Sequence, residues 1–341
     1  MCGRHRTSVS PIARNGSDPI VPPLFQCDQI NNSTFVITEA DDYGQSPYIY
    51  VTPTESTIHI LDTGVNSRGS GSDGSELYLR RFIETMDVAD NGNRPLNLGG
   101  LKGYTIGYSH GHFDHIGGIP QFEGAPGLSV YTSGFDPAFT NTTEALRQAS
   151  LAELFGLPTP EFDVTRWADD GEPVRDAAGE PVGELVILQT PGHTPDELAI
   201  WDPTERFLYV GDTLYRNEDI LFLQHSNLED YARTLGRLRK QVDAWNLASP
   251  AAGRVKLAAG HASRGEDAAE LLFQTDRLLY DIVRGAAVGT VEEPENWAPG
   301  SVLVSYQLAE EGIHFIGPKI MFDEFVNGGS EAAWELRRRF A

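Results

Sequence analysis

The sequence of 341 residues has little cysteine, little basic charge and no long apolar run. Its two cysteines, Cys2 and Cys27, both lie among the first 30 residues, which excludes a framework of disulfide bonds. No uninterrupted apolar stretch has the length that crosses a membrane, and the N-terminal residues lack the apolar run of a signal peptide. We therefore expect a cytoplasmic protein with no membrane partner.

Basic side chains are outnumbered, with 26 Lys and Arg residues against 49 Asp and Glu residues and a net charge of −23 at pH 7. A polyanion meets a repulsive average field at such a chain. The largest basic cluster, Arg337 to Arg339, closes a predicted terminal helix and is typical of a solvated helix end. We therefore expect no nucleic-acid partner.

The chain divides into three stretches of different composition. Residues 1–30 are rich in Pro, Ser, Asn and Gly without periodicity, which predicts an irregular leader arm. Residues 31–284 contain two β-rich halves with helices between them, which favours an α/β fold of two face-to-face sheets covered by helices, a four-layer αββα sandwich. Residues 285–341 are expected to pack on the same domain as an extension, where they cover the site, extend a sheet or mediate a homodimer.

Hydrophobic periodicity predicts individual elements within the central stretch. The predicted strands span residues 33–38, 47–51, 57–61, 128–132, 184–189, 197–201, 206–210 and 255–258, and the predicted helices span residues 76–86, 138–155, 228–245 and 267–283.

The strongest chemical signal is the run from Ser109 to His115, an H-x-H-x-D-H arrangement directly after a strand-like segment. Extended residues two apart point to the same side, so His110 and His112 converge on one ion, while the turn that follows directs Asp114 and His115 to a neighbouring ion. Three further metal-binding side chains each follow a different predicted strand: His193 in Thr-Pro-Gly-His-Thr, Asp212 in Val-Gly-Asp-Thr and His261 in Ala-Gly-His. Sheet scaffolds commonly position catalytic groups at strand ends in this way.

Over residues 30–265 this ordered set of motifs resembles the metallo-β-lactamase superfamily, and the resemblance implies the fold and the ligand roles. By this resemblance His110, His112 and His193 bind a first metal ion, Asp114, His115 and His261 bind a second, and Asp212 bridges both. Asp62, in Leu-Asp-Thr-Gly, resembles a superfamily element whose carboxylate supports the ligands from behind, with a turn at a strand end as the alternative.

Superfamily members that cleave antibiotics with two zinc ions typically have Cys where this chain has Asp212, so the resemblance points to the lactonase-like and glyoxalase II-like branches. It implies a hydrolase in which a hydroxide bridging two metal ions opens a small cyclic ester or amide, a lactone or a lactam. Asp114 would be both a ligand and the catalytic group that orients the nucleophile or returns a proton. Tyr215 is placed similarly to the catalytic tyrosine of lactonases, where it hydrogen-bonds the carbonyl oxygen, and a packing role is the alternative.

Several alternatives remain open at this point. The chain could instead be a glyoxalase II-like thioester hydrolase, an iron-dependent sulfur dioxygenase, or a binding protein of the same fold that has lost turnover. Imidazole and carboxylate ligands without thiolate favour zinc and also accept iron or manganese. Phe222 and His225, a few positions after Tyr215, are candidate residues for binding a small-molecule substrate.

Overall fold

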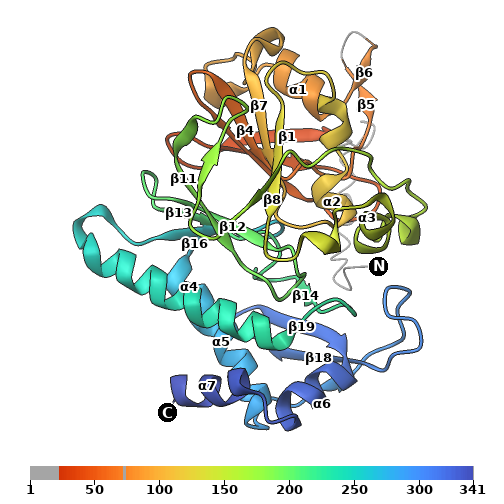
Figure 1. Cartoon of the computed structure of the whole chain (residues 1–341), viewed down its shortest axis with the longest axis vertical. Helices are drawn as coiled ribbons and strands as arrows, with labels where there is room; N and C mark the ends of the chain where they lie inside the picture. The colour runs from red at the N-terminus through yellow and green to blue at the C-terminus, as the bar shows by residue number, and fades with distance from the viewer. Residues whose placement is uncertain (1–22, 72–73, 341) are drawn as a thin grey trace, which may run out of the picture.

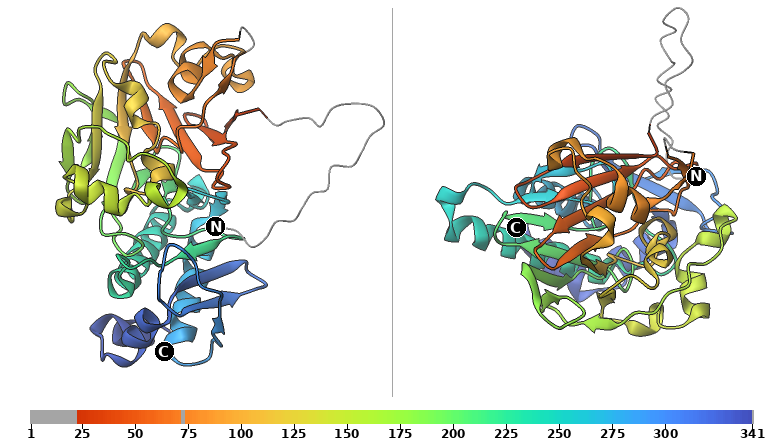
Figure 2. Two further views of the ribbon diagram at one scale, coloured as in Figure 1. Left: turned by 90° about the vertical axis from the view of Figure 1, so that its right-hand side faces the viewer. Right: turned by 90° about the horizontal axis from the view of Figure 1, so that it is seen from above.

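The computed structural model describes residues 23–71 and 74–340, and it contains two large β-sheets packed face to face with helices on their outer faces (Figures 1 and 2). Apolar side chains fill the space between the two sheets and the two spaces between the sheets and their helices. The predicted four-layer αββα fold is therefore confirmed.

The first sheet has seven strands and carries the first metal-binding motif at one edge. Its spatial order is β1 (Phe25–Gln29), β2 (Phe35–Glu39), β3 (Tyr48–Pro53), β4 (Thr57–Leu61), β7 (Gly103–Gly107), β8 (Ser129–Ser133) and β9 (Arg166–Ala168). The last four strands are parallel, so their carboxyl ends lie at the same edge of the sheet. A separate hairpin is formed by β5 (Gly69–Ser70) and β6 (Glu76–Leu77).

The second sheet has six strands in the order β10 (Pro173–Arg175), β11 (Pro181–Gln189), β12 (Leu198–Asp202), β13 (Phe207–Tyr209), β15 (Lys256–Ala258) and β16 (Arg264–Asp267). Strands β13 and β15 are parallel, so the loops after both leave the same edge. A third sheet, in the order β14 (Asp219–Leu221), β19 (Ile313–Pro318), β18 (Leu303–Leu308) and β17 (Thr290–Val291), joins the C-terminal extension to the segment after β13.

The helices form the outer layers. Those on the first sheet are α1 (Leu79–Thr85), α2 (Phe113–Ile116) and α3 (Thr143–Ala149); those on the second are α4 (Leu228–Ala248) and α5 (Ala268–Val283); and α6 (Lys319–Asn327) and α7 (Glu331–Arg339) belong to the extension. Short 3₁₀ turns are η1 (Ala89–Asn91), η2 (Leu98–Gly100), η3 (Ile119–Phe122), η4 (Pro137–Phe139), η5 (Ala152–Phe155) and η6 (Pro250–Ala252). Within the described ranges, none of the helices has the length and apolarity needed to cross a bilayer.

The two-residue period of the strands explains how both faces of each sheet become buried. In β2, Val36 points into the core between the sheets, while Ile37 points into the core under α1. In β12, Ile200 lies between the sheets and Trp201 packs toward α4 and α5. Burying an aliphatic side chain fully contributes about 1.5–3 kcal/mol. The alternating apolar pattern therefore fixes the register of the strands whose ends carry the ligands.

The long helices begin at side-chain caps that the sequence supplies. Asn227 accepts hydrogen bonds from the backbone N–H groups of Glu229 and Asp230 at the start of α4, and Asp267 accepts one from Glu270 at the start of α5. The predicted helices over 228–245 and 267–283 accordingly match α4 and α5 closely.

Two sequence-based predictions of secondary structure are wrong. The single helix predicted over residues 138–155 is instead η4, α3 and η5, because the chain takes a left-handed turn at Leu151, with φ +59°, after α3 ends. The irregular leader predicted over residues 1–30 is wrong for Phe25–Gln29, which form β1 and pair antiparallel with β2, and Cys27 lies in that strand. Residues 1–22, which include Cys2, lie outside the described residues.

The extension from residue 285 shares the core of α4 and α5. Ile313 and Phe315 from β19 and Leu336 from α7 belong to the same buried cluster as the inward face of these two helices. Arg339 also forms an ion pair at 2.7 Å with Asp276, a fully buried carboxylate of α5. Residues 285–340 are thus packed against the second sheet through its helices, as the lower part of Figure 1 shows.

Candidate metal centre

The predicted ligands follow strand ends at the shared edges of the two sheets. His110 and His112 lie in the loop after β7, and Asp114 and His115 lie in the single turn of α2. The loop is held on one side by the Tyr108 N–H, which donates to the Tyr131 carbonyl, and on the other by the Phe113 N–H, which donates to the Ser150 carbonyl. His193 follows β11, Asp212 follows β13 and His261 follows β15.

His110, His112 and His193 form a first cluster. The His110 Nε2 and His112 Nδ1 atoms lie 2.8 Å apart, and the His193 Nε2 and His112 Nδ1 atoms lie 3.4 Å apart. All three side chains are buried. Three imidazole nitrogens converging on one point are the donor set that a divalent transition-metal ion takes in proteins.

Asp114, His115 and His261 form a second cluster next to the first. The Asp114 Oδ2 atom lies 3.3 Å from His261 Nε2 and 3.8 Å from His115 Nε2. Asp212 lies between the clusters, because its Oδ1 atom is 3.5 Å from His115 Nε2 and the same carboxylate also groups with His110 and His115. The structure thus brings all seven predicted ligands together.

The hydrogen bonds behind the histidines leave the correct nitrogens free for a cation. His115 Nδ1 donates to Asp62 Oδ2 at 2.9 Å, His193 Nδ1 donates to the Leu221 carbonyl at 2.8 Å, and His261 Nδ1 donates to the Gln45 carbonyl at 2.9 Å. Because these bonds hold one imidazole proton on Nδ1, each Nε2 atom faces its cluster and is the atom that a cation would bind.

Two buried atoms at the centre have no hydrogen-bond partner in the part of the chain that the structure describes: His115 Nε2 and Asp212 Oδ1. Leaving a buried polar atom unsatisfied costs about 1–3 kcal/mol, and more for a charged group. A cation between them would satisfy both atoms at once. The residues present therefore fit a pair of divalent metal ions.

The two clusters differ in electrostatic character. Burial lowers the pKa of His110 well below its usual value and that of His112 to about 3, so both rings are neutral. Burial also lowers the pKa of His115 and His261. The carboxylates of Asp212 and Asp114 outweigh this effect and raise the pKa of both rings well above the usual value. The second cluster is therefore the one whose carboxylates attract positive charge most strongly.

Asp62 lies directly behind the ligands, where the resemblance placed it. Its Oδ1 atom accepts a hydrogen bond from the Ser109 N–H at 2.6 Å, and its Oδ2 atom accepts from the Ser109 hydroxyl at 2.9 Å and from His115. The Ser109 hydroxyl in turn lies 3.0 Å from His110 Nδ1, which donates to it. Asp62 and Ser109 thus orient one ring of each cluster, and this role of Ser109 had no signal in the sequence.

Tyr215 lies beside the second cluster, with its ring 5.8 Å from the ring of His261 and nearly perpendicular to it. Its hydroxyl donates a hydrogen bond to the Asp219 carbonyl at 3.0 Å. The predicted hydrogen bond to a substrate carbonyl would therefore require this bond to be exchanged.

The two candidate substrate-binding residues have different surroundings. The prediction for Phe222 is wrong, because its ring is fully buried among Tyr231, Phe315 and Phe322 in the apolar core. His225 is about half-buried, and its ring packs edge-on at 5.3 Å against Phe139. Burial lowers the pKa of His225, and its role in binding remains a prediction.

Sequence reasoning missed two adjacent buried carboxyl groups, Asp196 and Glu197, which follow His193 and precede β12. Burial raises the pKa of Asp196 to about 7 and that of Glu197 well above its usual value. The available signal was two acidic residues placed between a metal-binding histidine and a strand that begins with four apolar residues.

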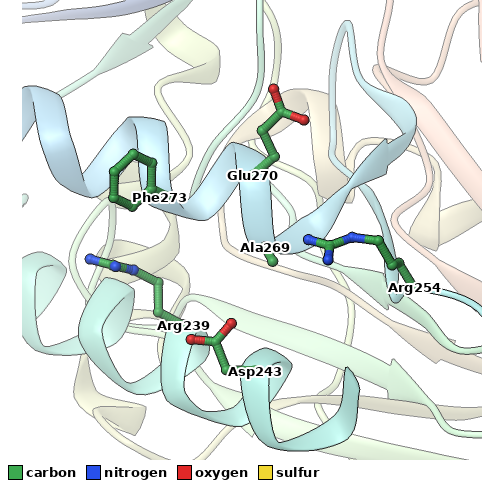
Figure 3. Close-up of a pocket in the computed structure, with 6 residues that line it drawn as sticks. All are labelled: Arg239, Asp243, Arg254, Ala269, Glu270 and Phe273. Atoms are coloured by element: carbon green, nitrogen blue, oxygen red, sulfur yellow. The ribbon is translucent and has the colours of Figure 1, made fainter. Parts of the chain in front are cut away.

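A surface pocket of about 330 Å³ lies between α4 and α5 (Figure 3), and none of its lining residues is a predicted ligand. Its two arginines are already paired, Arg239 with Asp276 and Arg254 with Asp267. The pocket is therefore separate from the metal centre.

Comparison with known proteins agrees with this geometry. The family model of the metallo-beta-lactamase superfamily matches residues 93–247, which contain six of the seven ligands. Among solved structures, a metallo-beta-lactamase family protein from Thermus thermophilus superposes with a TM-score of 0.51 at 21% identity, covering 76% of this chain and 84% of that one. This likeness shows that the fold is shared.

Three curated relatives extend the comparison to sequence. The chain is 30% identical to the putative transcription factor avaE of Aspergillus versicolor, with 82% of both proteins covered. It is 28% identical to the human acyl-coenzyme A thioesterase MBLAC2, covering 54% of this chain and 64% of that protein. It is 31% identical to a hydroxyacylglutathione hydrolase of Methylobacterium nodulans, covering 38% of this chain and 42% of that protein. With the ligand set complete, the fold shared and the family model matched across the motifs, the chain belongs to the metallo-β-lactamase superfamily.

Proposed function

We propose that this hydrolase cleaves acyl thioesters or esters of small molecules with two divalent cations held by its seven clustered ligands. The observation that carries the proposal is the position of Asp212, whose buried carboxylate lies between a cluster of three histidines and a second, acidic cluster. A bound pair of such cations supplies the Lewis acidity that makes water a nucleophile near neutral pH.

Two carboxylate ligands of the chain have different roles in this reaction. Asp212 keeps the two clusters in register, because its carboxylate groups with His110 of the first cluster and lies 3.5 Å from both His115 and His261 of the second. We assign to Asp114 the orientation of the attacking water and the return of a proton to the leaving atom, because it is the other carboxylate among the seven ligands.

The comparisons favour a thioester as the bond that is cleaved. The names of two relatives specify a coenzyme A thioester and a glutathione thioester as substrates of those proteins. Coenzyme A and glutathione are both anionic, and this chain, with a net charge of −23, would repel them on average. We therefore propose a thioester with a less anionic thiol, and the test includes a neutral one.

A lactone or a lactam is the second candidate, and the position of Tyr215 favours it. The ring of Tyr215 lies 5.8 Å from the ring of the ligand His261, which places it beside the metal centre, although its hydroxyl donates to the Asp219 carbonyl. Lactone hydrolysis would therefore be sensitive to the loss of this hydroxyl.

We propose zinc as the native cation, because imidazole and carboxylate ligands without thiolate suit its borderline character. Iron is the alternative cation that would change the reaction, since an iron-loaded centre could act as a sulfur dioxygenase instead of a hydrolase. Nucleic acid is not a proposed partner, because a polyanion meets a repulsive average field at a chain with a net charge of −23.

The test is a substrate panel on the purified chain loaded in turn with zinc, iron and manganese. The panel contains a neutral thioester, a coenzyme A thioester, a glutathione thioester, an aryl ester, a lactone and a lactam. Thiol release and acid release report hydrolysis, and an oxygen electrode with a persulfide reports dioxygenase activity. We expect metal-dependent thiol release that Asp212→Ala abolishes. Oxygen uptake without hydrolysis, or no turnover with any metal, would overturn the proposal.

A further inference from the structure

Glu197 is a buried carboxyl group that the proposed reaction does not use. It is fully buried and lies four residues after the ligand His193, immediately before β12. Within the described residues, no Lys or Arg forms an ion pair with it, and its nearest basic group is His110. Burying a carboxyl group without a cationic partner costs free energy of folding, so other interactions of Glu197 are expected to offset this cost.

The two oxygen atoms of Glu197 contact two different ligands. The Oε1 atom accepts a hydrogen bond from the Asp212 N–H at 2.9 Å. The Oε2 atom lies 3.6 Å from His110 Nδ1 and accepts from the Thr194 hydroxyl at 3.5 Å. His110 follows a strand of the first sheet and Asp212 follows a strand of the second, so this one side chain connects ligands from both sheets.

The neighbouring backbone is shaped around the Glu197 carboxyl group. Gly211 has φ +52°, and a Cβ atom there would clash with Glu197 Oε1 and lie 2.6 Å from the Ser109 Cβ atom. A side chain at position 211 would therefore displace both Glu197 and the residue that orients His110. This close fit indicates that the backbone at Gly211 is shaped to accommodate the Glu197 carboxyl group.

Glu197 also complements Asp62, because the two carboxyl groups lie next to different ligand rings. Asp62 fixes the ring of His115, whereas the ring of His110 donates from Nδ1 to Ser109 Oγ at 3.0 Å and has Glu197 Oε2 beside the same nitrogen at 3.6 Å, a contact that is electrostatic. The Ser109 acceptor and the nearby carboxyl oxygen of Glu197 favour a proton on Nδ1 and leave His110 Nε2 free to face the first cluster.

We propose that Glu197 is a positioning residue of the metal centre, which holds the Asp212 backbone and the His110 ring at once and so fixes the shared carboxylate relative to the first cluster. The inference rests on the proposed function only in that both require bound cations. It makes no use of the substrate.

Two substitutions test this role. Glu197→Gln keeps an acceptor for the Asp212 N–H but turns an amide donor toward His110 Nδ1, and Glu197→Ala removes both contacts. We expect Glu197→Ala to lower the affinity for both cations by 10- to 100-fold, as is usual when a partner behind a ligand is lost. We expect Glu197→Gln to weaken chiefly the ion bound by His110. Asp276→Asn is the matched control, because Asp276 is a fully buried carboxylate paired with Arg239 and Arg339, away from the ligands.

The measurement is a titration with Co²⁺ against a chromogenic chelator, with the visible absorption of the bound Co²⁺ as a second readout and far-ultraviolet circular dichroism as the check on folding. The control variant is expected to lose thermal stability with unchanged Co²⁺ affinity and spectrum. A folded Glu197→Ala that binds two Co²⁺ ions with wild-type affinity and spectrum would overturn the proposal. If Glu197→Ala does not fold, the nearly isosteric Glu197→Gln decides: an altered spectrum supports the role and an unaltered one overturns it.

Failure of this inference is distinguishable from failure of the proposed function. A wild-type chain that binds two cations but cleaves no member of the substrate panel contradicts the proposed function alone, provided that the Glu197 variants bind more weakly. A chain that takes up no cation contradicts both.

Discussion

Replacing Asp62 with Asn is expected to weaken the binding of the second cation by 10- to 100-fold, which corresponds to about 1.4–2.8 kcal/mol. Asp62 accepts hydrogen bonds from the Ser109 N–H, the Ser109 hydroxyl and His115 Nδ1. Asn retains one carbonyl oxygen for the Ser109 N–H and presents an amide donor to His115 Nδ1, which lies 2.9 Å from the present carboxylate oxygen.

The size of the effect follows from the tautomer of His115. A hydrogen bond to a charged group contributes about 1.5–3 kcal/mol, and this one keeps the imidazole proton on Nδ1. Facing an amide donor, the ring is more stable with its proton on Nε2, the atom that must carry the lone pair for the second cation. The backbone cost is small, because Asp62 has φ +63° and Asn tolerates this left-handed conformation well.

Titration of the folded variant with Co²⁺ against a chromogenic chelator measures the loss directly. Asp202→Asn is the matched control, because Asp202 is also a buried aspartate at a strand end that accepts backbone N–H groups, from Thr204 and Glu205, and it contacts no ligand. We expect the control to bind two ions normally. Wild-type affinity for both ions in Asp62→Asn would refute the assignment of the His115 tautomer.

Three further predictions follow from individual contacts. Asp212→Ala removes the carboxylate shared by both clusters, so turnover should be abolished and both ions should be lost more readily on dialysis, as metal analysis would show; full activity would refute the scheme. Tyr215→Phe removes the hydrogen bond to the Asp219 carbonyl and should lower the free energy of unfolding by about 1 kcal/mol while slowing turnover with KM unchanged; an unchanged turnover rate would leave Tyr215 a purely structural role. Burial lowers the pKa of the folded His59 ring to about 3, whereas the ring in the unfolded chain is protonated near pH 6.5. The stabilising contribution of neutral His59 to the free energy of unfolding is therefore complete above pH 6.5, and it falls by about 1.4 kcal/mol per pH unit below that value. In His59→Gln the decline of thermal stability between pH 6.5 and 4.5 should therefore be shallower than in the wild type, and parallel curves would contradict this account.

The ligand set could be predicted from the sequence because its signals are local. Four donors lie within the six positions from His110 to His115, and the other three each follow a recognisable strand. Strand periodicity then places these ends at shared sheet edges, so convergence needs no further information. The same locality explains why α4 and α5, whose caps and apolar faces are continuous in sequence, were predicted well.

Apart from Asp62, which the family resemblance indicated, the supporting residues could not be predicted because their partners are distant in sequence. Glu197 contacts His110 across 87 positions, and Gln45 accepts the proton of His261 across 216 positions. The break after α3 was missed for a different reason: Leu151 adopts a left-handed conformation although its apolar neighbours continue a helical pattern. Tertiary contacts there override the local preference.

The C-terminal extension shows how such distant contacts complete the metal centre. Strand β19 pairs in parallel with β14, and the Phe222 N–H donates to the Ile316 carbonyl at 2.8 Å. This pairing fixes Leu221, whose carbonyl accepts the Nδ1 proton of His193. Phe222, which was predicted to bind substrate, instead anchors this connection in the core beside Phe315. The change in composition at residue 285 therefore does not separate a catalytic part from an accessory one, because the orientation of a first-cluster ligand depends on a strand that begins 28 residues further on.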